Sequence, residues 1–344
     1  MNRLILVVAA LSLAACGSKS DADYQADVVQ GMHDQMLTQL QALHQAAVDL
    51  QAAAPAPAGR GWDAAQDAQA LTAMKTAWQT ARSSYELVEG AVAPLFPDAD
   101  YEIDARYDDF LANLAPDGDA NLFDGEGVTG MHAVERVLYA DVTPTNVVQQ
   151  ESTLPGSQPA SWPTSEAEAA SFKNALCARL VTDTQTLVDQ WTPQSIDVAG
   201  AFQGLTALMN EQREKVNKAA SAEEESRYSQ RTMKDIRDNL AGTRAAYALF
   251  QPWITSKPNG EQIDAQVEAS FAALDAAYAQ VSGDAIPQPP ADWSSESPSE
   301  ANLQTPFGKL YAAVNQAVDP NQSGSAVDGM NQAAKALGFP EFAE

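Results

Sequence analysis

Cysteine is nearly absent from this chain, since only Cys16 and Cys177 occur among its 344 residues. Cys16 lies at the end of an N-terminal apolar segment, so removal of that segment leaves a single thiol within the body of the protein. One thiol excludes an internal disulfide framework and a multi-cysteine metal cluster. Cys177 stands in an apolar helical stretch, and we expect it to be a small core residue.

Basic residues are also scarce. The chain has 20 lysines and arginines against 46 aspartates and glutamates, which gives a formal charge of -26 and a pI near 4.2. Affinity for nucleic acid arises when lysine and arginine displace counterions from phosphates, so this balance argues against a nucleic-acid ligand. Cations are natural partners of such a surface, although solubility alone accounts for most of the charge.

Long apolar runs are confined to the N-terminus. Residues 2–3 form a short positive leader, and residues 4–13 form an apolar stretch that is short for a membrane span. Small residues follow at the expected cleavage site. Residues 1–15 are therefore predicted to be an export signal, and no later segment is a candidate membrane span.

The end of this signal, Leu-Ala-Ala-Cys at residues 13–16, resembles a bacterial lipobox. The resemblance implies cleavage before Cys16, acylation of Cys16, and a mature protein over residues 16–344 that is held by lipid. Because neither Gly17 nor Ser18 is an aspartate, we expect the anchor to lie in the outer membrane and the protein to face the periplasm. The alternative is a plain secretory signal that happens to end in cysteine.

The alternation typical of strands is missing too. Apolar positions recur at spacings of three and four residues, which predicts an all-α fold. Short links between long helices favour antiparallel neighbours, so we expect two halves that resemble four-helix bundles, over residues 22–143 and 164–340. The predicted helices cover about residues 22–53, 64–93, 166–191, 198–219, 224–255, 260–281, 305–318 and 326–337, with one more from about residue 128, while residues 98–127 and 144–163 are predicted to be irregular.

Histidine occurs three times, and one copy lies in the sequence GMHAVE at residues 130–135. Residues three apart on a helix share a face, with Cβ atoms roughly 5–6 Å apart, so His132 and Glu135 can bind one ion together. An imidazole nitrogen and a carboxylate oxygen suit zinc, iron, manganese or copper better than calcium. The alternative is a pair on a helix surface. His33, in a matching Gly-Met-His tripeptide, and His44 are predicted to be polar flanks of an apolar seam.

A second acidic pair, Glu86 and Glu89, has the same spacing near the end of the preceding long helix. Its neighbours are apolar or aromatic, so this turn is expected to be half-buried. Acids in such a turn need a cation or strong donors to offset their desolvation. Antiparallel packing would bring this pair to His132 and Glu135, and the alternative is a solvated acidic face.

Three stretches resemble the imelysin-like family, in particular its EfeO-type and alginate-binding branch. GMHAVE is similar to the family motif Gly-x-His-x-x-Glu. YELVEGAVAPLFPDADYEIDARYDD (residues 85–109) resembles a stretch in which two glutamates precede a Leu-Phe-Pro turn and an Ile-Asp-Ala-Arg tetrad, and RYSQRTMKDIRDNLAGTRAAY (residues 227–247) resembles the Tyr-Ser motif and the helix after it. The resemblance covers about residues 22–337.

This resemblance implies two helical bundles related by an internal repeat, a place in the periplasm or outer membrane, and an association with iron uptake. It implies a metal site whose ligands or near-ligands are Glu86, Glu89, Asp104, His132 and Glu135. Arg106 is expected to pair with a ligand carboxylate or to form a surface salt bridge. Gln230 and Thr232 stand where EfeO-type members carry histidine and aspartate, which weakens any ligand contribution from the second half.

Three functions remain open. The first is a lipid-anchored periplasmic metal-binding protein that captures or presents an ion, iron foremost and zinc or copper otherwise, to uptake machinery. The second is a metallopeptidase, although the sequence has no His-Glu-x-x-His motif. The third is binding of an acidic polysaccharide, for which the basic residues between 227 and 244 could line a cleft, unless they form an intrahelical ladder with nearby acids. We expect a binding protein rather than an enzyme.

Overall fold

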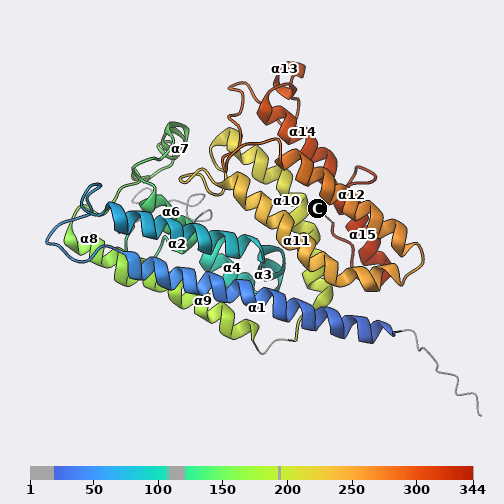
Figure 1. Cartoon of the computed structure of the whole chain (residues 1–344). Coiled ribbons are helices and arrows are strands. Elements are labelled where there is room, and N and C mark those ends of the chain that lie inside the picture. Colours follow the sequence, from blue (N-terminus) through green and yellow to red (C-terminus); the bar gives the residue numbers. More distant parts are fainter. Residues whose placement is uncertain (1–18, 106, 108–120, 193–194, 344) are drawn as a thin grey trace, which may run out of the picture.

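The chain folds into helices packed in two neighbouring groups (Figure 1). The structure is a computed structural model and describes residues 19–105, 107, 121–192 and 195–343. Within these ranges the chain contains no strand, so the predicted all-α fold is confirmed. No helix in the same ranges is both long and apolar enough to pass through a membrane. The internal repeat stays a prediction.

The first group is built on α1 (Asp21–Ala53), the long helix at the bottom of Figure 1. Ser20 begins it with a capping box, since its hydroxyl accepts from the Asp23 amide and the Asp23 carboxylate accepts from the Ser20 amide. Buried apolar side chains then recur every three or four residues along α1, which is why it packs against α2 (Ala68–Glu86) and α9 (Cys177–Trp191). The shorter elements of this part of the chain are α3 (Glu89–Leu95), α4 (Pro97–Asp100), the π-helix η1 (Tyr101–Ala105), α6 (Gly130–Leu138), α7 (Thr145–Glu151), α8 (Glu166–Ser171) and the π-helix η2 (Phe172–Leu176).

The second group contains the remaining helices and is joined to the first by direct packing. Helix α11 contacts α1 and α2, and α10 contacts α3. A single buried apolar core therefore extends through both groups, from Val28 in α1 to Leu337 at the end of the chain. The elements of this group are α10 (Val198–Lys218), the 3-10 turn η3 (Ala219–Ser221), α11 (Thr232–Thr255), α12 (Gly260–Tyr278), α13 (Glu300–Leu303), α14 (Pro306–Val318) and α15 (Ala326–Leu337).

The predicted helix over residues 64–93 is two helices in the structure, since α2 begins at Ala68, the helix breaks between Glu86 and Glu89, and α3 ends at Leu95. Helix α11 crosses at this break. A Cβ on Gly242 would lie 2.2 Å from the carbonyl oxygen of Leu87, so only glycine permits so close an approach. The crossing places the side chain of Asn239, one turn before Gly242 on α11, beside both glutamates.

The start of α11 differs from the prediction as well, at Thr232 rather than about residue 224. The preceding residues fold as turns, because the Thr232 hydroxyl accepts from the Ser226 amide and Gln230 has a left-handed φ of 57°. Two segments predicted to be irregular carry short helices instead: η1 and most of α4 lie within residues 98–127, and α7 lies within residues 144–163.

The predicted boundary between two halves, at residues 144–163, stays a prediction. Helices α8 and α9 follow that segment in the chain, yet α9 packs on α1 and lies alongside it in Figure 1. Cys177, at the start of α9, is buried as expected.

Candidate metal centre

His132 lies at the centre of a buried set of charged side chains. The first turn of α6 holds it, and its side chain is 3% exposed. The Nε2 atom lies 3.2 Å from Oδ1 of Asp104 in η1, and Nδ1 lies 3.2 Å from Oε2 of Glu135, one turn further along α6. Glu135 also accepts a hydrogen bond of 2.8 Å from the Ser229 amide.

The protonation of His132 follows from these contacts. Burial lowers its pKa, but the charge and hydrogen bond of Asp104 and the hydrogen bond to Glu135 outweigh burial and raise the pKa to about 10. Arg82 and His132 in turn hold the pKa of the buried Asp104 carboxyl below its usual range. The Asp104 carboxylate therefore favours the protonated form of His132 in this arrangement.

Glu86 and Glu89 meet across the break between α2 and α3. The Nδ2 atom of Asn239 donates to Oε2 of Glu86 at 2.6 Å and to Oε2 of Glu89 at 2.7 Å. From α10, Lys215 Nζ lies 3.0 Å from Glu89 but 3.9 Å from Glu86. The pKa of Glu89 is accordingly lowered by Lys215 against the effect of its burial, whereas burial raises the pKa of Glu86 well above its usual range.

Arg82 connects these two parts of the cluster. It lies one turn before Glu86 on α2, and its side chain is 1% exposed. Its guanidinium donates to Asp104 and forms an ion pair with Glu86. It also lies 3.2 Å from Glu225 and 3.6 Å from Asp235, so four carboxylates surround one guanidinium.

Carboxylates outnumber cations in this cluster. Its acids are Glu86, Glu89, Asp104, Glu135, Glu225 and Asp235, and its cationic groups are Arg82, His132 and Lys215. Burial and the charge of Glu225 raise the pKa of Asp235 to about 6, against the effect of Arg82. Buried acids without enough positive charge are costly unless a cation joins them.

The donor atoms suit a metal ion. Glu86, Glu225 and Asp235 each offer a carboxylate oxygen, and these oxygens lie within 4.8 Å of one another. These oxygens are hard donors of the kind that iron and manganese accept. Glu86 is the member of this group that also belongs to the predicted ligand set, and His132 is linked to it through Asp104 and Arg82.

Five predicted site residues, Glu86, Glu89, Asp104, His132 and Glu135, lie in this one cluster. His132 contacts Asp104 and Glu135 directly, and Arg82 links Asp104 to Glu86. Arg106 and Cys16 lie outside the described residues. The assignment of the five clustered residues as ligands stays a prediction, as do the ligand pairing of Arg106 and the acylation of Cys16.

The sequence analysis missed three residues that pair with the acids, Arg82, Lys215 and Asn239, and two further acids, Glu225 and Asp235. Only Arg82 carries a local signal, since it lies four residues before Glu86 on the same helix. The other four come from α10, α11 and the turn between them, and they reach the cluster only through the tertiary fold.

Gln230 and Thr232 contribute to the turn before α11. The Gln230 amide donates to Glu224 at 2.8 Å and to the Arg227 carbonyl at 2.9 Å. The Thr232 hydroxyl accepts from Ser226. These two side chains shape the turn that brings Glu225 to Arg82.

The basic residues in α11 and just before it have partners in the chain, most of them outside this helix. Lys234 bonds to Asp238 within the helix, whereas Arg237 donates to the carbonyl oxygens of Tyr278 and Val281. Arg231 and Arg244 form ion pairs with acids outside α11. The predicted intrahelical ladder therefore accounts for one pair, and most of the basic groups stabilise the packing around α12.

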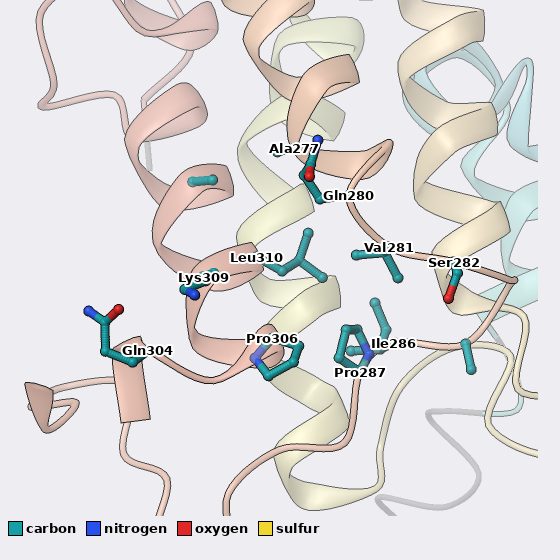
Figure 2. A pocket seen from close by; sticks show the side chains of 12 residues that line it. Ala277, Gln280, Val281, Ser282, Ile286, Pro287, Gln304, Pro306, Lys309 and Leu310 are labelled. Carbon is teal, nitrogen blue, oxygen red and sulfur yellow. The ribbon is translucent and has the colours of Figure 1, made fainter. Parts of the chain in front are cut away.

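A separate pocket of about 820 Å³ opens between the ends of α12 and α14 (Figure 2). Ile286, Pro287, Pro306 and Leu310 give it an apolar lining, and Lys309 is its charged group. A pocket without a carboxylate or imidazole is a poor metal site, so the cluster around His132 is the better candidate for the predicted ion.

The fold and the cluster define an all-α protein with a buried acid and histidine centre, and comparison with known proteins assigns its family. The sequence profile described as imelysin (peptidase M75) matches residues 29–331, which is most of the chain. The chain belongs to the imelysin family.

Several curated relatives share one name. The chain is 26% identical over 206 residues to the iron uptake system component EfeO of Escherichia coli (strain K12), and equally to the proteins of that name in Shigella flexneri and Shigella sonnei (strain Ss046). The aligned region covers 60% of this chain and 44% of each relative. The chain thus matches less than half the length of these relatives.

Proposed function

We propose that this chain is a lipid-anchored iron-binding protein of the cell envelope, which captures an iron ion in the periplasm and presents it to uptake machinery. The observation that carries the proposal is the buried cluster that joins His132 through Asp104 and Arg82 to the glutamate pair, where carboxylates outnumber the cations. An added cation would offset the desolvation of these acids. The name of the EfeO relatives, an iron uptake system component, favours iron over zinc or copper.

The proposed ligands are Glu86, Glu89, Asp104, His132 and Glu135. His132 and Asp104 approach the cluster from α6 and η1, and the glutamate pair approaches from the break between α2 and α3. Asn239 and Lys215 fix the glutamate pair from the opposite side, so their role is to position these ligands. The ion is the cargo of the protein, and the residues bind and orient it.

Metal binding by the purified chain tests this function. Chelator-treated protein should bind about one Fe(II) under anaerobic conditions, or one Fe(III) supplied as citrate, measured by elemental analysis after gel filtration. His132→Ala should weaken binding by about 100-fold, because it removes the nitrogen donor. The matched control is His33→Ala, which alters the other Gly-Met-His tripeptide and should leave affinity unchanged.

Several results would count against the proposal. Equal affinity of wild type and His132→Ala would remove the site from consideration. Chelator-sensitive cleavage of a denatured protein would favour the peptidase alternative, and calcium-dependent retention on alginate would favour polysaccharide binding.

Lipid anchoring is supported by the sequence of residues 13–16. Cys16→Ala should release the protein from the membrane fraction into the soluble fraction, because a lipid chain contributes about 0.8 kcal/mol per buried CH₂. Incorporation of labelled palmitate should disappear in the same variant. A Cys177→Ala variant is the control and should stay in the membrane fraction.

A further inference from the structure

Arg82 has carboxylate partners of two kinds. Asp104 and Glu86 are proposed ligands of the ion, whereas Glu225 and Asp235 come from the turn before α11 and from α11 itself. The guanidinium lies between Asp104 and Glu86, where it joins the two carboxylates that a shared ion would also join. A bound cation and this guanidinium therefore compete for the same oxygens.

We propose that Arg82 is the internal competitor of the cargo ion: when iron binds, the guanidinium gives up Asp104 and Glu86 and moves onto Glu225 and Asp235. The inference rests on the proposed function and assigns a residue that regulates the same site. Arginine stays protonated at any pH at which the protein folds, so it cannot be neutralised and has to move.

The structure provides the receiving partners. Glu225 already lies 3.2 Å from Nη2 of Arg82. Asp235 Oδ2 lies 3.6 Å from Nε, and the buried Nε has no hydrogen-bond acceptor. A shift of less than about 1 Å would bring this pair within hydrogen-bond distance. The present position thus leaves one donor of Arg82 unsatisfied, and movement toward α11 would satisfy it.

Competition with a buried guanidinium also selects the charge of the ion that can bind. Two carboxylates hold a monovalent guanidinium here, and the Coulomb energy of their interaction with an ion scales with its charge. A monovalent ion gains no charge advantage over Arg82, whereas a divalent or trivalent ion does. Sodium and potassium at cellular concentrations are therefore excluded by Arg82 itself.

The first test compares metal affinity across substitutions of Arg82. Arg82→Gln removes the competing charge and should bind Zn(II), used as a redox-stable probe, and anaerobic Fe(II) at least 10-fold more tightly in calorimetry. The chelator-treated variant should melt at a lower temperature than wild type and recover more on metal addition. Unchanged or weaker affinity in a folded Arg82→Gln protein would overturn the proposal, because Arg82 would then be a scaffold for the ligands.

If Arg82→Gln fails to fold, Arg82→Lys tests whether Arg82 competes with the metal ion. Lysine keeps the charge but carries one ammonium on a shorter stem, so it cannot span Asp104 and Glu86 together. We expect affinity about 3-fold or more above that of wild type. Affinity equal to or below wild type in this variant would also overturn the proposal.

A double-mutant cycle tests the movement toward α11. Asp235→Asn should weaken metal binding about 10-fold in the wild-type background, because Arg82 loses a receiving partner, and should change it less than 2-fold in the Arg82→Gln background. A loss of equal size in both backgrounds would make Asp235 a ligand and overturn the proposed movement. Asp238→Asn, one turn away on α11 and paired with Lys234, is the matched control.

Failure of the competitor role of Arg82 can be distinguished from failure of the proposed function. If wild-type protein binds neither Fe(II) nor Zn(II), or binds them independently of His132, the function fails. If binding depends on His132 but no Arg82 variant binds more tightly, only the competitor role fails.

Discussion

The tripeptide Gly-Met-His occurs twice, at residues 31–33 in α1 and at residues 130–132 in α6, and the two copies differ in their surroundings. Both methionines are fully buried in the core. The side chain of His33 is 25% exposed and bonds to the Thr192 carbonyl oxygen at 3.1 Å, whereas that of His132 is 3% exposed and has a carboxylate on each ring nitrogen. The same local sequence thus gives a boundary residue in one region and a candidate ligand in the other.

This difference teaches that the chemistry of a tripeptide is decided by what packs against it. Helix α1 is long and uniform, so one face of the first copy meets the core and the other meets solvent. The second copy begins a short helix, all of whose residues are buried, between η1 and α2. Corresponding residues in and beside the two tripeptides can be substituted in pairs, and the effects of the two substitutions can then be compared.

The acid beside each histidine should show the largest contrast. Glu135 is fully buried and accepts from both His132 and the Ser229 amide, so Glu135→Ala would leave a buried imidazolium and a buried N–H without this partner. We expect a loss of about 3–5 kcal/mol in the free energy of unfolding, measured by urea denaturation of chelator-treated protein. Asp34→Ala, beside His33 on the surface, should leave the denaturation midpoint unchanged. Equal losses in the two variants would contradict the comparison.

The two glycines should differ by a smaller amount. Gly130 has a φ of +86°, and a Cβ there would lie 2.7 Å from the carbonyl oxygen of Ile103, next to Asp104. Gly130→Ala should therefore cost about 2 kcal/mol or more. A Cβ on Gly31 would meet only the movable end of the Leu249 side chain, and alanine improves helix propensity by up to about 1 kcal/mol.

The net change for Gly31→Ala should thus stay within about 1 kcal/mol of zero. Urea denaturation of both variants under identical conditions checks the pair. The comparison breaks if Gly31→Ala proves the more destabilising of the two.

Periodicity predicted the fold well where helices are long and bordered by local signals. The expected bounds of α1, α10, α14 and α15 agree with the structure within about two residues, because an apolar stripe and a cap are both encoded nearby. The prediction failed at residues 87–88 and 224–231. There the backbone follows contacts with distant residues, such as Leu87 against Gly242, and no local pattern encodes them.

The candidate site, too, was predictable from the sequence only where the signals are local. Helical spacing alone found the pairs His132 with Glu135 and Glu86 with Glu89, and only the family resemblance pointed to Asp104. Lys215 and Asp235 could not be found from spacing, because each lies more than a hundred residues from Glu86 along the chain and reaches it through the packing of α10 and α11. Arg82 could have been found, since its i,i+4 relation to Glu86 is local.

Titration should give the smallest contrast between the two regions. In the region of Glu135, the ring partner of His132, burial and the charge of Glu135 raise the pKa of Glu224 from 4.5 to about 7. Between these two pH values folded protein holds a proton that unfolded protein has released, so stability falls as pH rises through this window. Glu224→Gln keeps the acceptor for Gln230 but cannot ionise. It should gain about 1–2 kcal/mol over wild type at pH 8 and nothing at pH 4 in urea denaturation.

The matching substitution near His33 is Asp34→Asn. Hydrogen bonds from Gln30 and His33 lower the pKa of Asp34, but its side chain is exposed, so water screens the interaction and the stability of this variant should follow the wild-type pH profile. Glu224→Gln should instead give a flatter profile than wild type above pH 5. Parallel profiles for Glu224→Gln and wild type would mean that the acids around His132 ionise as freely as those on the surface of α1, and the contrast between the two regions would then rest on packing alone.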